Sequence, residues 1–422
     1  MHRVVNLPNG VRLALAPMPD MASVSLGFWV GVGGRYEPAP VNGVSHFIEH
    51  MLFKGTRRRT AREISQAVEG VGGYLNAWTS EEHTCFYAKA RHDRFAELLD
   101  VLADMLLHSR FAPRELEKER GVIQEEVAMY LDQPAQHVQE LLNALQWPDH
   151  PLGRPLTGTE ESVARLRRPD LLSFFRHHYH GQNLVIAVAG CLNPDEVIPK
   201  VGRFAGSLPG NGGRSVFDPI VIRQDRPRLR VQTRKTEQAQ LALGLRTCSR
   251  HDDRRFALRL LNTVLGENMS SRLFQIVREE TGLAYNIYSS LSFFDDVGDL
   301  VISAGLDPDA LPKVLRLVVR ELRRLKTTAP SATELRRARD YVIGQMDLSL
   351  ENTENRMMWL GEQVLGYGKV TPVEAVKDKL QAVRPADLRR VASDFFLPNR
   401  ANLALVAPLR RSPRLVEILE TL

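Results

Sequence analysis

The residues best suited to chemistry form the run His46-Phe47-Ile48-Glu49-His50. An α-helix turns once in about 3.6 residues, so side chains 46 and 50 share one face and two imidazoles can reach a single ion. Glu49 lies on the same face, close enough to meet a water at the ion without binding the ion itself. This order, HxxEH, is the HExxH zinc motif reversed. A solvated polar face is the alternative interpretation of these five residues.

A catalytic zinc usually takes three protein ligands and leaves a fourth position for water. The third ligand must therefore come from elsewhere in the chain. A glutamate-rich helix is predicted after Pro113, and its Glu119 and Glu126 are seven residues apart, on one partly apolar face. Burying an unpaired carboxylate is costly, and a metal with its histidines would be a suitable partner. The alternative is an acidic face in water.

Three segments resemble a known family: GVSHFIEHMLFKGT, GGYLNAWTSEEHTCFY and ERGVIQEEV. They are similar to the zinc peptidases that include pitrilysin, insulin-degrading enzyme and the mitochondrial processing peptidase (peptidase family M16), in its short two-domain bacterial-type branch. In that family the third ligand follows the second histidine by the spacing found here, 126 − 50 = 76. The resemblance therefore implies Glu126, rather than Glu125, as the third ligand.

The same resemblance implies one zinc ion per chain, held by His46, His50 and Glu126, with Glu49 as the general base. The family has a further acidic residue one heptad before the third ligand. Here that residue is Glu119, which would orient a ligand from outside the metal's own ligand set.

Substrate contacts are also implied by likeness to the family. The segment SSRLFQIVREETGLAY contains Arg278 and Tyr285, seven residues apart, and the family uses such a pair to bind the substrate backbone and the developing oxyanion. Residues 75–79 resemble an edge strand whose backbone pairs with an extended peptide. We name Asn76 and Ala77 there; an ordinary strand asparagine is the alternative for Asn76.

Turn and cap signals predict the elements that must hold these residues. Asn9-Gly10 between two apolar runs predicts a β-hairpin. A strand is expected at 24–32, a helix at 43–53 and a strand pair at 74–79 and 84–90. Capping boxes, which mark helix starts, are predicted at Thr60/Glu63, Ser331/Glu334 and Thr371/Glu374.

The length of 422 residues favours two domains. A Pro- and Gly-rich segment at 207–225 separates a zinc-binding domain, 1–206, from a second domain, 226–422. Both halves end alike, since Pro169 and Pro385 are 216 residues apart and Asn183 and Asn402 are 219 apart. We expect two similar α+β domains from an internal duplication, each a mainly antiparallel sheet with helices on one face, in a clamshell arrangement. Coincidence between two ordinary helix–strand joints is the alternative.

Composition narrows the class of protein. The chain is 43% hydrophobic and 25% charged, and it has no apolar run of the roughly 18–20 residues that span a bilayer. The net charge of +6 is spread along the sequence, and no nucleic-acid motif accompanies it. Three isolated cysteines argue against a disulfide framework. We expect a bacterial cytoplasmic protein with no nucleic-acid or membrane partner.

The sequence thus predicts a zinc-dependent endopeptidase acting on unfolded peptides or oligopeptides. A homodimer is expected, because one chain carries both sets of site residues; a paralogous subunit is the other arrangement. The alternative function is a peptide-binding or assembly subunit without catalysis, as in heteromeric processing peptidases.

Overall fold

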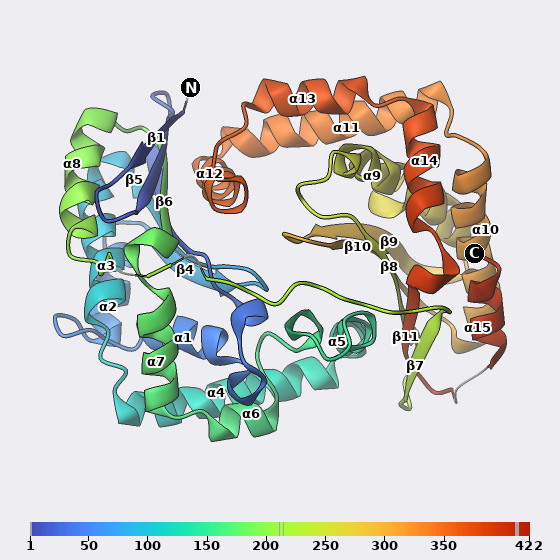
Figure 1. Cartoon of the computed structure of the whole chain (residues 1–422), viewed down its shortest axis with the longest axis horizontal. Coiled ribbons are helices and arrows are strands. Elements are labelled where there is room, and N and C mark those ends of the chain that lie inside the picture. The colour runs from blue at the N-terminus through green and yellow to red at the C-terminus, as the bar shows by residue number, and fades with distance from the viewer. Residues whose placement is uncertain (1, 211, 214, 410–412) are drawn as a thin grey trace. The chain divides into compact units, whose positions relative to one another are not determined.

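The computed structural model describes residues 2–210, 212, 213, 215–409 and 413–422, coloured from blue to red along the chain in Figure 1. The chain forms two compact units whose sequences interleave. The first unit consists of Met1–Ala128, Arg154–Asp218 and Asp347–Thr371. The second unit consists of Met129–Gly153, Pro219–Met346 and Pro372–Leu422. Each unit contains one β-sheet and its own hydrophobic core.

The first unit is built on a six-stranded sheet in the order β1-β2-β6-β3-β5-β4. Its strands are β1 (Arg3–Asn6), β2 (Arg12–Pro17), β3 (Ser23–Val30), β4 (Tyr74–Thr79), β5 (Thr84–Arg91) and β6 (Leu184–Gly190). β1 and β2 pair antiparallel across the turn at Gly10, which has φ +89° and confirms the predicted hairpin. β2 and β6 run parallel, whereas the other pairs are antiparallel.

Most helices of this unit cover one face of the sheet. They are α1 (Val44–Leu52), α2 (Ala61–Glu69), α3 (Phe95–His108), α4 (Pro113–Asp132), α6 (Glu160–Arg165), α7 (Arg168–His178) and α8 (Pro194–Ala205). Side chains alternate between the faces of a strand, so Leu26 and Phe28 of β3 point the same way. They share a buried cluster with Ile48 of α1 and Leu102 of α3.

The second unit repeats this topology with five strands in the order β7-β11-β8-β10-β9. These are β7 (Arg228–Thr233), β8 (Ala239–Thr247), β9 (Ala284–Phe293), β10 (Gly298–Leu306) and β11 (Ala401–Ala407). β7 and β11 are parallel, as β2 and β6 are, and the remaining pairs are antiparallel. The order therefore matches β2-β6-β3-β5-β4, which supports an origin by duplication.

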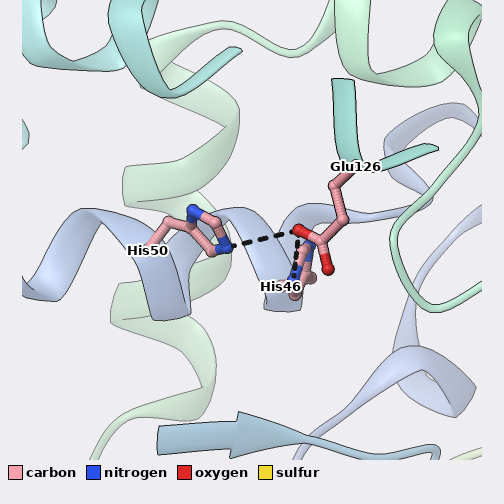
Figure 2. Close-up of side chains that lie close together, drawn as sticks. All are labelled: His46, His50 and Glu126. Atoms are coloured by element: carbon pink, nitrogen blue, oxygen red, sulfur yellow. Dashed lines mark ion pairs between the residues drawn. The ribbon is translucent and has the colours of Figure 1, made fainter. Parts of the chain in front are cut away.

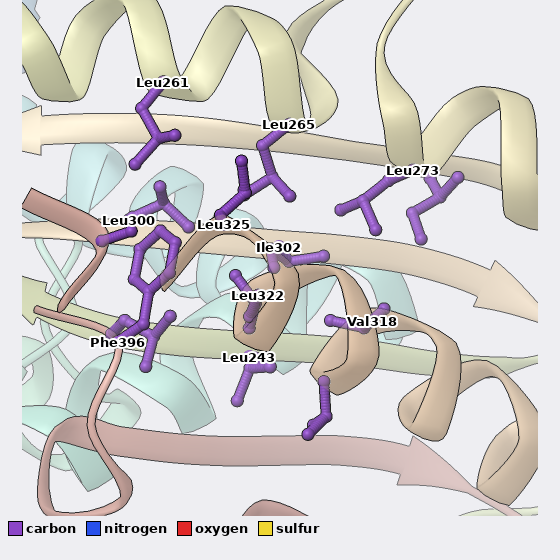
Figure 3. Close-up of a cluster of buried hydrophobic side chains, with 14 of the residues drawn as sticks. Leu243, Leu261, Leu265, Leu273, Leu300, Ile302, Val318, Leu322, Leu325 and Phe396 are labelled. Carbon is purple, nitrogen blue, oxygen red and sulfur yellow. The ribbon is translucent and has the colours of Figure 1, made fainter. Parts of the chain in front are cut away.

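The helices of the second unit also pack on one face of their sheet. They are α9 (Arg254–Asn262), α10 (Leu311–Thr327), α11 (Ala332–Glu351), α13 (Val373–Ala382), α14 (Pro385–Phe395) and α15 (Pro413–Glu420). Figure 3 shows Leu243, Leu300 and Ile302 of the sheet meeting Leu322 of α10 and Phe396 after α14. The repeated start of α7 and α14 is visible too, since each begins with an arginine and aspartate capping box.

The other face of each sheet is covered by one helix from the opposite half of the sequence. α12 (Thr353–Tyr367) packs on β2, β3 and β6, where Met357 and Leu360 join a buried cluster with Trp29 and Val185. α5 (Pro134–Gln146) packs on β8 and β11 of the second unit through the cluster of Val138, Leu141, Leu142, Ala242, Ala404 and Val406. α5 and α12 each follow a helix of 20 residues, so they are equivalent elements of the repeat. Each sheet is therefore completed by an exchanged helix.

The predicted fold class is confirmed: both units are α+β, with mainly antiparallel sheets of matching order. The predicted boundaries of the two sequence repeats, 1–206 and 226–422 with a linker at 207–225, stay a prediction. The compact units have other bounds, because α5 and α12 are exchanged. Residues 211 and 214 of the predicted linker lie outside the described residues.

Two of the three predicted capping boxes are present. Thr60 and Glu63 open α2, and Ser331 and Glu334 open α11. The box at Thr371/Glu374 was wrong. α13 starts one residue later than expected, with Pro372 at its N-cap, and no side chain caps it. The Thr371 N–H instead donates to Oε1 of Gln363.

Candidate metal centre

α1 carries His46, Glu49 and His50 on the side that faces away from the core. Phe47 and Ile48 are fully buried, and they fix the rotation of this nine-residue helix about its axis. The two histidines remain half-buried, with ring centroids 4.6 Å apart. The i, i+4 spacing therefore places both imidazoles side by side, as the sequence predicted.

α4 brings Glu126 to the two rings from a distant part of the sequence. One carboxylate oxygen, Oε2, lies 3.6 Å from Nε2 of His46 and 3.7 Å from Nε2 of His50. Figure 2 shows this oxygen between the rings. Among the described residues these three side chains form the one group of histidine, cysteine or acidic residues with the spacing of a metal site, and their ligand atoms all lie within 4.8 Å of one another.

The donor set fits a zinc ion. Ligands about 2.1 Å from a tetrahedral zinc lie roughly 3.4 Å from each other. The distances of 3.6 and 3.7 Å between the carboxylate oxygen and the ring nitrogens are close to that value. Two imidazole nitrogens and one carboxylate also leave a fourth position for water, as catalytic zinc sites do.

The protonation state of His46 suits a ligand. Burial lowers the pKa of His46 to about 3, and the neighbouring His50 adds to this effect. The imidazole is therefore neutral at neutral pH, with a lone pair available to a metal.

Glu119 contacts the ring nitrogen of His50 that is not directed at Glu126. Its Oε2 lies 3.1 Å from Nδ1 of His50, and its Oε1 lies 2.9 Å from Nζ of Lys54. The carboxylate is buried, so Lys54 compensates its charge. A proton on Nδ1 of His50 would be shared with Glu119, which leaves Nε2 free to face the ion. Glu119 therefore contacts a predicted ligand, and its orienting role stays a prediction.

Glu49 stands beside the metal cluster and is held by a residue that the sequence analysis missed. Thr79 Oγ1, at the end of β4, donates to Glu49 Oε2 over 2.6 Å. Burial raises the pKa of Glu49, while the bond from Thr79 opposes that rise. Thr79 lies in the segment 75–79 already singled out by resemblance, but strand alternation alone does not reveal that its hydroxyl meets a helix residue.

Asn76 and Ala77 lie on β4, which forms one edge of the first sheet. Their register partners on β5 are Tyr87 and Phe86. Asn76 is exposed, and its Oδ1 accepts from the Ala77 N–H over 2.9 Å. An edge strand is the element that peptide pairing requires, while the pairing itself stays a prediction.

Arg278 and Tyr285 belong to the second unit. The guanidinium of Arg278 lies over the Phe274 ring, 4.8 Å from its centroid, and Tyr285 on β9 is 64% exposed. Both side chains are accessible, and their role in catalysis stays a prediction.

The second unit has a glutamine at the helix position that matches Glu126. Because α4 and α11 both contain 20 residues, Ala332 corresponds to Pro113 and Gln345 corresponds to Glu126. A glutamine lacks the negative charge that favours zinc binding, so the duplicated helix is not equipped to supply the third ligand.

Comparison with known proteins also distinguishes the two halves of the chain. Residues 12–160 match the family described as insulinase (peptidase family M16), and residues 165–342 match the peptidase M16 inactive domain. An uncharacterized zinc protease of Bacillus subtilis is 38% identical over 405 residues, which cover 96% of this chain and 98% of that one. An uncharacterized zinc protease of Streptomyces coelicolor is 37% identical over 414 residues, covering 97% and 90%.

Solved structures share the fold at lower identity. A protease from Helicobacter pylori superposes with a TM-score of 0.89 at 22% identity, over 97% of this chain and 99% of that chain. A peptidase M16 inactive domain from Pseudomonas fluorescens gives a TM-score of 0.90 at 17% identity, over 98% and 99%.

Proposed function

We propose that this chain, which belongs to peptidase family M16, is a zinc-dependent endopeptidase with its metal on His46, His50 and Glu126. The observation that carries the proposal is the position of one Glu126 oxygen between the two Nε2 atoms. The name zinc protease borne by its close relatives supports the same activity.

The residues of the site divide the work of peptide hydrolysis. Zinc in this cluster would supply Lewis-acid polarisation and a water of lowered pKa. Glu49 accepts the proton as water attacks the scissile carbonyl and then returns it to the leaving amine. Thr79 holds one oxygen of Glu49, which leaves the other to face the water. Glu119 orients His50, and β4 offers its backbone edge to an extended substrate.

We assign the oxyanion contacts to Arg278 and Tyr285 on family likeness. Hydrogen-bond donors aimed at a developing negative charge contribute a large share of catalysis in acyl transfer. Arg278→Ala and Tyr285→Phe should therefore lower kcat and leave zinc content unchanged. Full activity in both variants would remove these two residues from the mechanism.

The test of the proposal combines metal content with cleavage of an internally quenched peptide. The purified protein should contain one zinc per chain, and a chelator should abolish cleavage until zinc is returned. Glu49→Gln should keep zinc but lose about 10²- to 10⁴-fold in kcat, because the general base is gone. Exposed Glu125, next to the third ligand, provides a control: Glu125→Gln should keep both zinc and activity.

The same experiment separates an enzyme from a non-catalytic subunit. A peptide-binding or assembly protein would bind peptide without turnover, and its chelated form would bind as well. The complete set of His46, His50, Glu126 and Glu49 favours the enzyme, since a binding module needs neither a metal nor a base.

We further propose a bacterial cytoplasmic homodimer that acts on unfolded peptides. Sedimentation should then give twice the chain mass of 47.6 kDa. A species of 47.6 kDa at micromolar concentration would argue against the dimer.

Within the described part of the chain, no helix combines the length and the apolar character needed to cross a bilayer.

A further inference from the structure

The first turn of α1 lacks a cap of its own. Its N-cap residue is Gly43, which has no side chain to offer. A Cβ at this position would lie 2.8 Å from the carbonyl oxygen of Thr157, and φ is +92°, so glycine is required. The N–H groups at the start of a helix need partners, and here those partners must come from another part of the chain.

Glu37 supplies these partners from six residues upstream. Its Oε2 accepts from the Gly43 N–H over 2.7 Å, and its Oε1 accepts from the Ser45 N–H over 2.8 Å. Nδ2 of Asn42 also donates to Oε2, over 3.0 Å. The side chain is buried, and a carboxylate at this end of a helix is favoured by the helix dipole. Burial raises the pKa of Glu37, and these hydrogen bonds oppose that rise.

The backbone around Glu37 is tied to the turn between β4 and β5. The Gly34 N–H donates to the Ser80 carbonyl over 3.1 Å, and the Arg35 N–H donates to the Glu81 carbonyl over 2.7 Å. The guanidinium of Arg35, itself buried, reaches Oε1 of Glu82 over 2.8 Å. This turn directly follows Thr79, so residues 34–37 connect the hairpin that holds the general base to the helix that carries it.

We infer that Glu37 is a positioning residue for the metal centre. By accepting hydrogen bonds from the start of α1, it fixes where His46 and His50 present their rings to Glu126. Ser45, whose N–H it binds, directly precedes His46. A shift of this helix end moves the rings relative to α4, and metal sites tolerate displacements of only about 0.5 Å. The inference rests on the proposed zinc site.

Two substitutions test whether the hydrogen bonds of Glu37 hold the first turn of α1 in place. Glu37→Ala removes all three hydrogen bonds at once. Glu37→Gln keeps the volume but directs an NH₂ group at one set of donors, either the Ser45 N–H or the pair from Gly43 and Asn42. The matched control is Thr60→Ala, which removes the N-cap of α2, a neighbouring helix without a metal ligand. All three variants remove or weaken a helix cap, but only the first two disturb α1.

The measurement is zinc affinity by competition with a chromophoric chelator, with circular dichroism and thermal unfolding of the metal-free proteins alongside. We expect both Glu37 variants to bind zinc about 10- to 100-fold more weakly than wild type, as loss of supporting partners does in other metal sites. Thr60→Ala should bind zinc with an affinity within about threefold of wild type, even if its Tm falls as far as the Tm of the Glu37 variants. Should Glu37→Ala fail to fold, the Glu37→Gln result decides.

Wild-type affinity in a folded Glu37→Gln protein overturns the inference. An equal loss of affinity in Thr60→Ala overturns it too, because the effect would then be general destabilisation. A wild-type protein that binds no zinc overturns the proposed function, and this inference with it.

Discussion

Thr79 and Glu49 meet through a side-chain hydrogen bond of 2.6 Å that joins the end of β4 to α1. A base that must take a proton in a defined direction gains from having one oxygen fixed, because orientation is a large part of catalytic efficiency. In the proposed mechanism Thr79 would therefore act on catalysis through Glu49, the proposed base.

We expect Thr79→Val to lower kcat by about tenfold while KM and zinc content stay within about twofold of wild type. Thr79→Ser keeps the hydroxyl and should restore most of kcat. Steady-state kinetics on the quenched peptide provide the measurement. A Thr79→Val enzyme with wild-type kcat, or a serine variant as slow as the valine variant, would contradict the role.

For single residues, the sequence predicted the contacts that depend on spacing within one helix. His46 and His50 are four residues apart on a helix, so their shared face follows from helix geometry. Glu126 was chosen by family resemblance, since the helix also offers Glu125, and it is the residue that reaches the rings. Thr79 and Glu37 were missed because their partners lie on other elements, and no spacing within a single element encodes such contacts.

Among the elements, α12 shows how closely the exchanged helix fits the first sheet. A Cβ on Gly361 would lie 2.1 Å from Nε1 of buried Trp29. Backbone and indole ring therefore meet with no room for a methyl group.

Gly361→Ala should lower the free energy of unfolding of the first unit by about 1–3 kcal/mol, the usual range for overpacking. Gly202, inside α8 of the same unit, has open space where a Cβ would lie. Gly202→Ala should be neutral or stabilise by up to about 1 kcal/mol, because alanine favours a helix over glycine. Urea unfolding followed by Trp fluorescence compares the two. A Gly361→Ala protein as stable as Gly202→Ala would mean that α12 does not pack against Trp29.

The start of α11 predicts how stability depends on pH. Burial would raise the pKa of Glu334, but hydrogen bonds from Arg272 and from the Ser331 cap outweigh it and lower the pKa to about 2. A carboxylate whose pKa is depressed on folding stabilises the protein above its unfolded pKa, and this stabilisation disappears as pH falls towards the folded value.

Wild type should therefore exceed Glu334→Gln in stability most at pH 6–7. The difference should shrink as pH falls from about 4.5 towards 2, where the wild-type carboxyl also becomes neutral. Urea unfolding of both proteins at pH 7, 5 and 3.5 tests this. A gap that is constant, or that widens in acid, would show that the charge of Glu334 contributes nothing.

The elements themselves were largely predictable. The strand pair expected at 74–79 and 84–90 is present as β4 and β5, and capping boxes located α2 and α11. The exchange of α5 and α12 was not predictable, because an amphipathic helix shows that one face is buried without showing which sheet buries it. The start of α13 was misplaced because Thr371 bonds through its backbone to Gln363.

At the scale of the whole molecule, the exchange means that a single cut in the chain cannot release a complete unit. A fragment of residues 1–225 lacks α12 and would expose the apolar face around Trp29 and Val185. Exposed apolar surface of this kind binds hydrophobic dyes and promotes aggregation.

We expect the 1–225 fragment to aggregate, or to bind the dye ANS strongly, when it is expressed alone. Co-expression with 226–422 should restore a soluble complex that binds little dye, because α12 is then present. Light scattering and dye fluorescence measure both states. A monomeric, dye-silent 1–225 fragment would contradict the structural role of the exchanged helix.

Anomalous diffraction can show whether His46, His50 and Glu126 hold one zinc ion. Crystals of the wild-type protein are measured just above and just below the zinc absorption edge. We expect one strong difference peak per chain, about 2.0–2.2 Å from both Nε2 atoms and from a Glu126 oxygen. A peak elsewhere, or no peak here in crystals grown with zinc, would contradict it.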